Sequence, residues 1–504
     1  MRSSRNSKTE RLTVPFQSVY PVRQIRAIEQ AALNAGQPLM ARAGLAAATL
    51  ARRLLNEMPR SPGRGVLLVA GPGNNGGDAL ECALHLKQWY YRVSMVLAGD
   101  EAKLPPDARN ALAKWRQAGG TLEADIPAGG HWDLVVDGLF GIGLARPISA
   151  GHAELVARIN ALQTPVLALD IPSGLNADTG AVLGVAVRAT DTLSFIGLKP
   201  GLLTLDGPDH CGRLHCAPLE VETSQTMPEG QLLDEGVRDA LPRRPANFHK
   251  GSAGDVGVIG GAEGMVGAAL LAGRAALRMG TGRVFVACLA AHAPAVDMHY
   301  PELMMRAPES VLAQCPVLLL GPGMGTEVRA SDLLRRALEG RQTLVLDADA
   351  LNLLAGNASL AALLNGRTGA ALMTPHPGEA ARLLGMSTPQ VQQDRIASAL
   401  ALARRYHCPA LLKGNGSVLA EPSGRWWINP TGNPGMASAG MGDTLAGMLA
   451  SLLAQGMRPD QALCLAVWMH GAAADELVAA GRGPRGITAS DVMAQAHLIL
   501  NRPR

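Results

Sequence analysis

The sequence predicts an α/β protein of two domains, each built on a parallel, doubly wound sheet. The chain has 504 residues, which is too many for one ordinary hydrophobic core. Continuous apolar strands alternate with helix-length stretches, a pattern typical of parallel sheets that are covered by helices on both faces. The alternation stops near the middle of the chain and then restarts, so two separate units are expected.

The first domain is predicted to span residues 20–222. Two helix-length stretches, VRQIRAIEQAALNAG and LAAATLARRLLNEM, precede a strand of sequence VLLVA. Further apolar strands follow, with room for a helix between them: VSMVLAG (93–99), LVVDGLF (134–140) and VLALDIP (166–172). Each strand ends in a polar or glycine-rich loop. Such loops should gather at the carboxyl edge of the sheet, where doubly wound sheets bind their ligands.

The second domain is predicted over residues 247–504, after a linker at 223–246 that carries proline and charge without clear periodicity. Its expected strands lie at 255–261, 284–290, 317–323, 343–349, 371–377 and 410–416, before Ala- and Leu-rich helices. Residues 1–19 are expected to be a disordered tail, because Met1–Arg11 lacks the apolar segment of a signal peptide. No apolar run of about 18 residues is free of glycine or charge, so no membrane span is predicted.

Composition argues against several classes of protein. The net charge is +4 without a long Lys/Arg block, and aromatic residues make up 3%, so nucleic-acid binding has little support. The seven cysteines are an odd number without framework spacing, which indicates reduced thiols in the cytoplasm. The stretch HCGRLHC (210–216) resembles half of a metal site. We favour a strand approached by a turn, because the sequence offers no second half.

The stretch GPGNNGGDAL (71–80) has the glycine spacing G-x-G-x-x-G of a loop that binds a dinucleotide pyrophosphate. That spacing alone is a weak signal of an NAD-dependent dehydrogenase. In addition, Asn74, Asn75 and Asp78 supply polar side chains that a simple phosphate loop does not need. The loop therefore suggests a ligand with more polar groups than a bare phosphate.

Three loops of the first domain share this chemistry, at 72–78, 136–147 and 170–180, and each follows a predicted strand. Glycine allows close approach of a ligand, and Asp, Asn and Ser oxygens can coordinate a hard cation or hydrogen-bond a ribose or amide. The alternative is that these residues only cap helices and form turns. Three similar loops at successive strand ends favour a binding site.

In the second domain, the stretch NPGMASAGMGDTLAGMLASLL (433–453) places Asp443 among glycines at the start of an apolar helix. Backbone N–H groups at a helix N-terminus suit a phosphoryl group in transfer, and a carboxylate there can accept a hydroxyl proton. An N-cap aspartate on a glycine-rich turn is an equally good reading of this stretch taken alone.

Four other loops follow predicted strands of this domain: GPGMG (321–325), LDADALNLL (346–354), TPHPGE (374–379) and KGNGS (413–417). Lys413 and the flexible N–H groups beside it suit a nucleotide phosphate, although a lone Lys-Gly pair is usually a turn. Asp347 and Asp349 could support Mg²⁺ or only cap a helix. His376 lies between two prolines, where a hydrogen-bonded loop residue is the commoner role.

The motifs PGNNGGD, VDGLFGIGL and ALDIPSGLNADTG together resemble the YjeF N-terminal family of NAD(P)HX epimerases, over about residues 20–220. The resemblance implies a Rossmann-like three-layer sandwich that interconverts the R and S epimers of the hydrates NADHX and NADPHX. It implies acid–base work by Asp170 and a potassium ion held by Asn75, Asp137 and Ser173. The substrate contacts it implies are Asn74, Asn75, Gly76, Gly77, Asp78, Gly141, Ile142, Gly143, Leu144, Ala145, Arg146, Pro147 and Asp170.

Three positions depart from that family's usual pattern. Ala79 replaces Gly, Gly138 replaces Ala, and Ile142 replaces a Thr whose hydroxyl lies in a substrate loop. The Ile142 departure leaves open the hypothesis that the first half is a non-catalytic binding module.

Six motifs of the second half, in order and spacing, resemble the YjeF C-terminal family of ADP- or ATP-dependent NAD(P)HX dehydratases: GMVGAALLAGRAALRMGTG, GPGMG, LDADALNLL, TPHPGE, KGNGS and NPGMASAGMGDTLAG. The resemblance covers about residues 247–500 and implies a ribokinase-like α/β fold. It makes Asp443 the base at the hydrate's hydroxyl. The hydrate contacts it implies are Ala268, Gly323, His376 and Asp443. The ADP contacts it implies are Lys413, Gly414, Asn415, Gly416, Ser417 and Gly442.

The mechanism that these resemblances imply is phosphorylation of the hydrate's hydroxyl by ADP, followed by loss of phosphate to restore NAD(P)H, with Mg²⁺ assisting. ADP is typical of fused members of the family, but the residues alone do not separate ADP from ATP. The implied partners are small molecules and other copies of the chain, as a homo-oligomer, without nucleic acid or membrane. A ribokinase-like small-molecule kinase with an accessory domain is the alternative, and TPHPGE together with the paired first domain counts against it.

Overall fold

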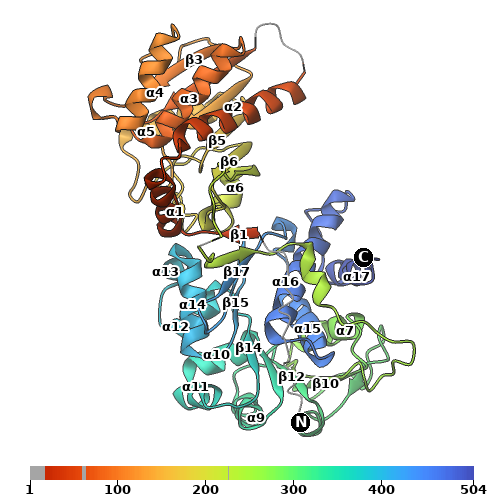
Figure 1. Cartoon of the computed structure of the whole chain (residues 1–504). Helices are drawn as coiled ribbons and strands as arrows, with labels where there is room; N and C mark the ends of the chain where they lie inside the picture. The colour runs from red at the N-terminus through yellow and green to blue at the C-terminus, as the bar shows by residue number, and fades with distance from the viewer. Residues whose placement is uncertain (1–16, 60–63, 225, 504) are drawn as a thin grey trace, which may run out of the picture.

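The computed structural model describes residues 17–59, 64–224 and 226–503, and it shows two lobes, each with its own sheet (Figure 1). The first sheet has the strand order β3-β2-β4-β5-β6-β7, and all of its neighbouring strands are parallel. Its strands are β2 (Gly65–Ala70), β3 (Arg92–Leu97), β4 (Leu134–Gly138), β5 (Val166–Leu169), β6 (Asp191–Phe195) and β7 (Arg213–Ala217). The four strands expected from apolar runs in this half are confirmed.

Helices cover both faces of the first sheet. They are α1 (Val22–Asn34), α2 (Leu39–Glu57), α3 (Asn74–Gln88), α4 (Pro106–Gln117), α5 (Ala150–Ala161) and α6 (Gly207–Cys211), with the short turns η1 (Glu101–Lys103) and η2 (Pro200–Leu202). Successive side chains of a strand point to opposite faces. Leu68 of β2 accordingly packs in one core with α2, α3 and α4, while Leu67 packs in another with α5. The predicted three-layer sandwich is confirmed.

The second sheet has the order β1-β8-β17-β16-β15-β14-β13-β12-β9-β10-β11. The strands from β15 to β11 are parallel, whereas β16 runs antiparallel to both of its neighbours. The strands of the second half are β8 (Gly230–Leu232), β9 (Asp255–Gly260), β10 (Arg283–Cys288), β11 (Met304–Met305), β12 (Val317–Leu320), β13 (Thr343–Leu346), β14 (Ala371–Met373), β15 (Ala410–Leu412), β16 (Ser417–Ala420) and β17 (Trp426–Asn429). All six predicted strands of this half are present.

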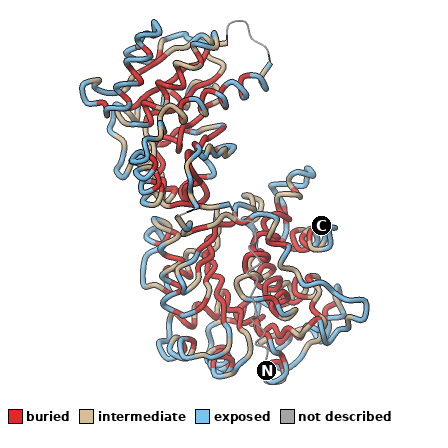
Figure 2. The backbone as a smooth tube through the Cα atoms, in the orientation of Figure 1, coloured by how far each residue is buried: buried red, intermediate tan, exposed pale blue. Residues whose placement is uncertain are grey.

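This sheet also separates two cores. Buried segments run through the interior of both lobes (Figure 2). The helices of the second half are η3 (Glu235–Ala240), α7 (Val266–Arg278), α8 (Pro308–Gln314), α9 (Val328–Glu339), α10 (Ala348–Gly356), α11 (Ala358–Asn365), α12 (Pro377–Leu384), α13 (Thr388–Gln393), α14 (Arg395–Arg405), η4 (Pro434–Met436), α15 (Met441–Ala454), α16 (Pro459–Ala479) and α17 (Ala489–Leu500). Helix α15 packs directly on α7. A Cβ added at Gly447 would lie 2.1 Å from the carbonyl oxygen of Ala272, so glycine is what permits this close approach.

The segments that flank the first half contribute to the second sheet. Strand β1 (Gln17–Val19) pairs antiparallel with β8, and β8 pairs with β17. The tail expected at 1–19 lies outside the described residues except for 17–19, and there the expectation of disorder is wrong. The segment 223–246 likewise contains β8 and η3. Such short strands gain order from partners far away in the sequence, which local periodicity does not reveal.

Helix α16 is long and apolar enough to cross a membrane by length and composition, with a mean hydropathy of 1.3 over its best window. Most of that window, 78%, is buried inside the protein. Leu465, Ala466 and Met469 belong to the core between α16 and the sheet. Packing within the fold therefore accounts for the apolar character of this helix.

Candidate functional site

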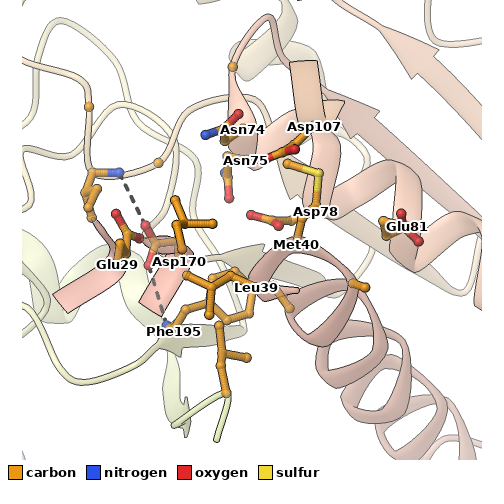
Figure 3. Close-up of a pocket in the computed structure, with 18 of the residues that line it drawn as sticks. Glu29, Leu39, Met40, Asn74, Asn75, Asp78, Glu81, Asp107, Asp170 and Phe195 are labelled. Atoms are coloured by element: carbon orange, nitrogen blue, oxygen red, sulfur yellow. Dashed lines mark hydrogen bonds between the residues drawn. The ribbon is translucent and has the colours of Figure 1, made fainter. Parts of the chain in front are cut away.

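The first half contains a cavity of about 1020 Å³ at the carboxyl ends of its strands (Figure 3). The three loops expected to form a site meet there. The cavity is lined by the predicted residues Asn74, Asn75, Asp78, Gly141, Ile142, Gly143, Leu144, Ala145, Arg146 and Asp170. Gly76 and Gly77 are instead buried in the first turn of α3. Among the predicted substrate contacts, Gly76, Gly77 and Pro147 do not line the cavity.

Asp170 is held by contacts to both of its carboxylate oxygens. Its backbone adopts a left-handed conformation with φ +67°, which is uncommon for a residue other than glycine. The fully buried ammonium of Lys199 donates a hydrogen bond to Oδ1, and also donates to Ser194 Oγ at 3.0 Å. The backbone N–H of Ile142 reaches Oδ2 at 3.4 Å. The carboxylate is thus fixed at the cavity wall with a buried cation behind it.

Two of the other carboxyl groups that line this cavity, those of Glu29 and Asp78, have raised pKa values. Figure 3 shows Glu29 beside Asp170, with Asp78 on the side of α3. Burial, then the negative charge of Asp170, raises the pKa of Glu29 to about 7. Burial, then Asp170 and Glu29, raises the pKa of Asp78 well above its ordinary value. The cavity therefore combines the lysine-paired carboxylate of Asp170 with a glutamate whose pKa lies near neutrality, an arrangement suited to proton transfer.

Two of the three residues expected to hold potassium, Asp137 and Ser173, are hydrogen-bonded to each other, and the third, Asn75, lines the cavity. Ser173 donates from its N–H to Asp137 Oδ2 at 2.8 Å and from its Oγ to Asp137 Oδ1 at 2.7 Å. Burial raises the pKa of Asp137 to about 6, although hydrogen bonds from Ser173 and Leu139 lower it. Asn75 Nδ2 donates to the Leu169 carbonyl, while its buried Oδ1 has no hydrogen-bond partner in the described structure. A buried amide oxygen without a partner is a suitable ligand for a hard cation.

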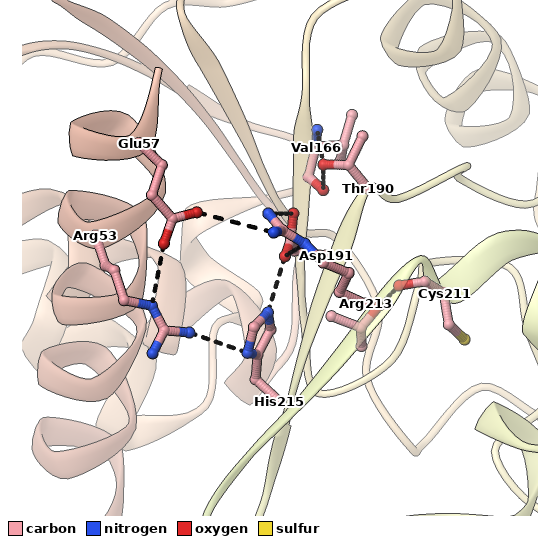
Figure 4. Close-up of polar contacts among 9 residues, drawn as sticks. Arg53, Glu57, Val166, Thr190, Asp191, Cys211, Arg213 and His215 are labelled. Carbon is pink, nitrogen blue, oxygen red and sulfur yellow. Dashed lines mark hydrogen bonds and ion pairs between the residues drawn. The ribbon is translucent and has the colours of Figure 1, made fainter. Parts of the chain in front are cut away.

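The HCGRLHC stretch forms the turn and strand favoured from sequence. His210 bonds the Val187 carbonyl, and His215 pairs with the buried carboxylate of Asp191 at 2.8 Å (Figure 4). Arg213 pairs with the same carboxylate at 3.0 Å. Within the described part of the chain, no group of three or more His, Cys, Asp or Glu is arranged to hold a metal ion. This cluster ties β6 and β7 to α2.

Asp443 lies in the first turn of α15, after the left-handed N-cap Gly440 (φ +85°). Burial, then the negative charge of Asp347, raises the pKa of Asp443 to about 7, against the opposing charge of Lys413. The first N–H groups of a helix lack partners within the helix. The turn therefore offers anion-binding donors beside a carboxyl group that can accept a proton near neutral pH.

Lys413 joins the predicted nucleotide loop to this turn. Its Nζ lies 2.7 Å from Asp347 Oδ1, and a Cβ added at Gly442 would lie 3.3 Å from the same Nζ. Thr374 also donates to Asp347 Oδ1, at 2.9 Å. Burial lowers the pKa of Lys413, but the carboxylates of Asp347 and Glu379 outweigh this and raise it. Lys413, Gly442 and Asp443 thus meet at one place, as the resemblance implies.

His376 caps helix α12 and accepts from the Gly378 N–H at 3.0 Å. Burial, then the positive charges of Lys413 and Arg382, lowers its pKa, so the half-exposed imidazole is neutral at neutral pH. Gly323 and Ala268 are neighbours, because a Cβ added at Gly323 would lie 3.3 Å from the Ala268 Cβ. Asp349 accepts from the Gly325 N–H at 2.8 Å and so shapes the GPGMG loop.

Sequence reasoning missed two residues that bear on the first site: Glu29, which lines the cavity, and Lys199, which pairs with Asp170 from the protein interior. Lys199 is a lone lysine within the apolar run SFIGLKPGLL, and this isolation was the available signal that it has a buried partner. Glu29 lies on an ordinary-looking helix, α1, and only the packing of α1 against the cavity distinguishes it.

Comparisons with known proteins assign a family to each half. Residues 36–201 match the family described as YjeF-related protein N-terminus, and residues 256–496 match the family described as NAD(P)H-hydrate dehydratase. A solved structure of the ADP/ATP-dependent NAD(P)H-hydrate dehydratase from Bacillus subtilis, co-crystallised with ATP and Mg²⁺, is 30% identical. It covers 53% of this chain and 95% of its own, with a TM-score of 0.47.

Relatives match both halves at once. The bifunctional NAD(P)H-hydrate repair enzyme Nnr of Coxiella burnetii is 38% identical over 497 residues, covering 96% of this chain and 99% of the relative. The Nnr enzyme of Escherichia coli is 37% identical, covering 92% of this chain and 89% of the relative. The chain belongs to the family of bifunctional NAD(P)H-hydrate repair enzymes, which join an epimerase domain to a dehydratase domain.

Proposed function

We propose that the second half dehydrates the S epimer of NADHX and NADPHX with ADP as phosphoryl donor, and that the first half interconverts the two epimers. The observation that carries the proposal is the position of Asp443. A carboxyl group with its pKa raised to about 7 lies in a helix-start turn beside Lys413, as transfer from a nucleotide to a hydroxyl requires.

The dehydration proceeds in two steps, a phosphoryl transfer and an elimination. Asp443 takes the proton of the hydrate's hydroxyl as its oxygen attacks the β-phosphorus of ADP, and AMP leaves. The phosphorylated hydrate then loses phosphate together with a proton from the neighbouring ring carbon, which restores the double bond of NAD(P)H. Phosphate is a much better leaving group than hydroxide. The loop at 413–417 and the N–H groups at the start of α15 bind and orient the phosphates.

Mg²⁺ and potassium would bind in different halves of the chain and to different kinds of ligand. Mg²⁺ typically binds through one or two carboxylates together with substrate phosphates. Asp347 and Asp349, at the start of α10, supply two carboxylates on the side of Lys413, so a divalent ion would complete its shell with the nucleotide. Asn75, Asp137 and Ser173 would hold potassium beside the first cavity, where its charge would support an anionic substrate.

In the first half, inversion at the hydrated carbon requires its bond to the oxygen or to the ring nitrogen to break and to re-form on the opposite face, and in either route a proton moves at the oxygen. Asp170, fixed by Lys199, and Glu29 beside it are placed to exchange that proton. The predicted contacts from Asn74 to Asp78 and from Gly141 to Pro147 would then hold the nucleotide part of the hydrate.

Potassium dependence tests the assignment of the cation site. Epimerisation is expected to rise with added potassium chloride at constant ionic strength, and Asn75→Ala is expected to weaken the apparent potassium affinity by at least about 10–100-fold. Dehydration of the S epimer by the same preparation is the internal control. An epimerase rate that is indifferent to replacement of potassium by a large organic cation would contradict the assignment.

The proposal also includes a cytoplasmic location and a homo-oligomeric state. The seven cysteines all lie in the described residues, and all are free thiols, which supports a reducing compartment such as the cytoplasm. Small molecules as the only ligands, and a homo-oligomeric state, are carried over from the resemblance.

The decisive experiment uses the full chain with both epimers of NADHX, Mg²⁺ and either ADP or ATP, and follows the recovery of NADH absorbance. Complete recovery with ADP is expected. Recovery that stops at the fraction of S epimer would mean that the first half only binds. A stable phosphorylated product without NADH would favour the small-molecule kinase.

A further inference from the structure

The two halves touch at the nucleotide loop itself. The Thr204 hydroxyl, from the first half, lies 2.9 Å from the Gly416 carbonyl oxygen and 3.1 Å from that of Asn415. The Leu205 N–H donates to the Asn415 carbonyl at 3.3 Å, and the Asn415 side chain donates back to the Leu205 carbonyl at 2.8 Å. A short segment of the first half, 203–205, therefore binds the backbone of the loop between β15 and β16.

Arg395 contacts both the segment 203–205 and the start of this loop. Its side chain is almost fully buried, and Nε donates to the Thr204 hydroxyl at 2.9 Å. Nη2 donates to the carbonyls of Leu412 and Lys413, both at 3.3 Å. Burial lowers the pKa of Arg395 to about 10, so it stays charged at neutral pH. Among the described residues it makes no ion pair, and its hydrogen bonds are what compensate the burial of its charge.

Two glycines of the loop lie so close to Leu203 and Arg395 that a side chain at either position would collide with them. Gly416 has φ +60°, and a Cβ there would lie 2.0 Å from the Leu203 carbonyl oxygen. Gly414 has φ +141°, and a Cβ there would lie 2.9 Å from the guanidinium of Arg395. The opposite side of the loop is open, since Gly414 and Asn415 are exposed.

We propose that the first half completes the nucleotide site of the second, with Thr204 and Arg395 as positioning residues that hold the backbone of 413–417 in the shape that receives ADP. The inference rests on the proposed role of that loop in nucleotide binding. It makes the affinity for ADP depend on a hydroxyl that lies outside the dehydratase half. Preorganised donors bind a ligand without the cost of ordering the loop.

Thr204→Val keeps the shape of the side chain and removes its hydroxyl. This variant is expected to raise the KM for ADP, and the Kd of ADP with Mg²⁺ measured by calorimetry, about three- to tenfold, with kcat changed much less. Thr204→Ser, which restores the hydroxyl, is expected to recover the wild-type values. The matched control is Thr192→Val, because the buried Thr192 hydroxyl donates only within the first half, to the Cys211 carbonyl at 2.7 Å.

Arg395→Lys is the second test, because it keeps the charge but loses the fork of N–H donors. It is expected to shift the KM for ADP in the same direction as Thr204→Val, without a matching loss of kcat. The inference is overturned if wild type binds ADP and both Thr204→Val and Arg395→Lys match the Thr192→Val control. If wild-type protein neither binds ADP nor dehydrates the hydrate with it, the proposed function fails instead.

Discussion

Replacing Asp443 with Asn is expected to slow ADP-dependent dehydration by about 10²–10⁴-fold, the usual contribution of a general base. The amide has nearly the same shape as the carboxylate but cannot accept the hydroxyl proton. Epimerisation by the same chain should be unchanged, because Asp170 and Asp443 lie in different lobes. Dehydration of the S epimer is measured by the return of NADH absorbance at saturating ADP.

The pH dependence of wild-type dehydration provides a second readout of the same residue. Asp443 acts as a base only when ionised, and its pKa is raised to about 7. The value of kcat/KM for the S epimer is therefore expected to rise with pH through about 7 and then level off. A rate that stays flat from pH 5 to 8 would rule out Asp443 as the base.

As the pH rises through about 7, the contribution of Asp443 to folding stability should fall while the rate of dehydration rises. A carboxyl group whose folded pKa is raised above its unfolded value contributes stability at low pH, and that contribution is lost as the pH rises through the folded pKa. Asp443→Asn is therefore expected to melt at a higher temperature than wild type at pH 8, with the difference shrinking toward pH 4. Asp460→Asn is the matched control, because Asp460 also lies in a first helical turn but pairs with Arg458.

Much of the fold could be predicted because buried parallel strands leave a strong local signal. Runs such as VLLVA and VLLLG are apolar at every position, since both faces of the sheet are covered. The glycine-rich loops after them mark the carboxyl edge. Most of the predicted residues of the first cavity do line it, and Lys413, Gly442 and Asp443 come together in the second half.

The remaining features depend on contacts between distant residues. Val19 pairs with Gly230 across the entire length of the first half, and neither three-residue strand has a periodic pattern of its own. Arg395 looks like an exposed helix-start residue, yet its partner Thr204 belongs to the other half. Glu29 acquires its raised pKa only through burial and the charge of Asp170. Sequence patterns report local burial, whereas these features arise from tertiary packing.

Asp170→Asn is expected to lower the rate of epimerisation by about 10²–10⁴-fold and to leave dehydration of the S epimer intact. The substitution also leaves the buried ammonium of Lys199 without its carboxylate. Removing one member of a buried ion pair typically costs about 3–5 kcal/mol of folding free energy. The single variant is therefore expected to be less stable as well as inactive in epimerisation, and loss of activity alone would not separate the two effects.

The double variant Asp170→Asn with Lys199→Met separates them, because it removes the uncompensated charge while keeping a long apolar side chain in its place. Its melting temperature is expected to return toward that of wild type, whereas epimerisation stays at the spontaneous rate of the hydrate in buffer. Recovery of epimerisation along with stability would mean that Asp170 serves only to balance Lys199. Persistent loss of epimerisation in a stable chain that still dehydrates the S epimer would assign the proton transfer to Asp170, because the second half reports on folding within the same molecule.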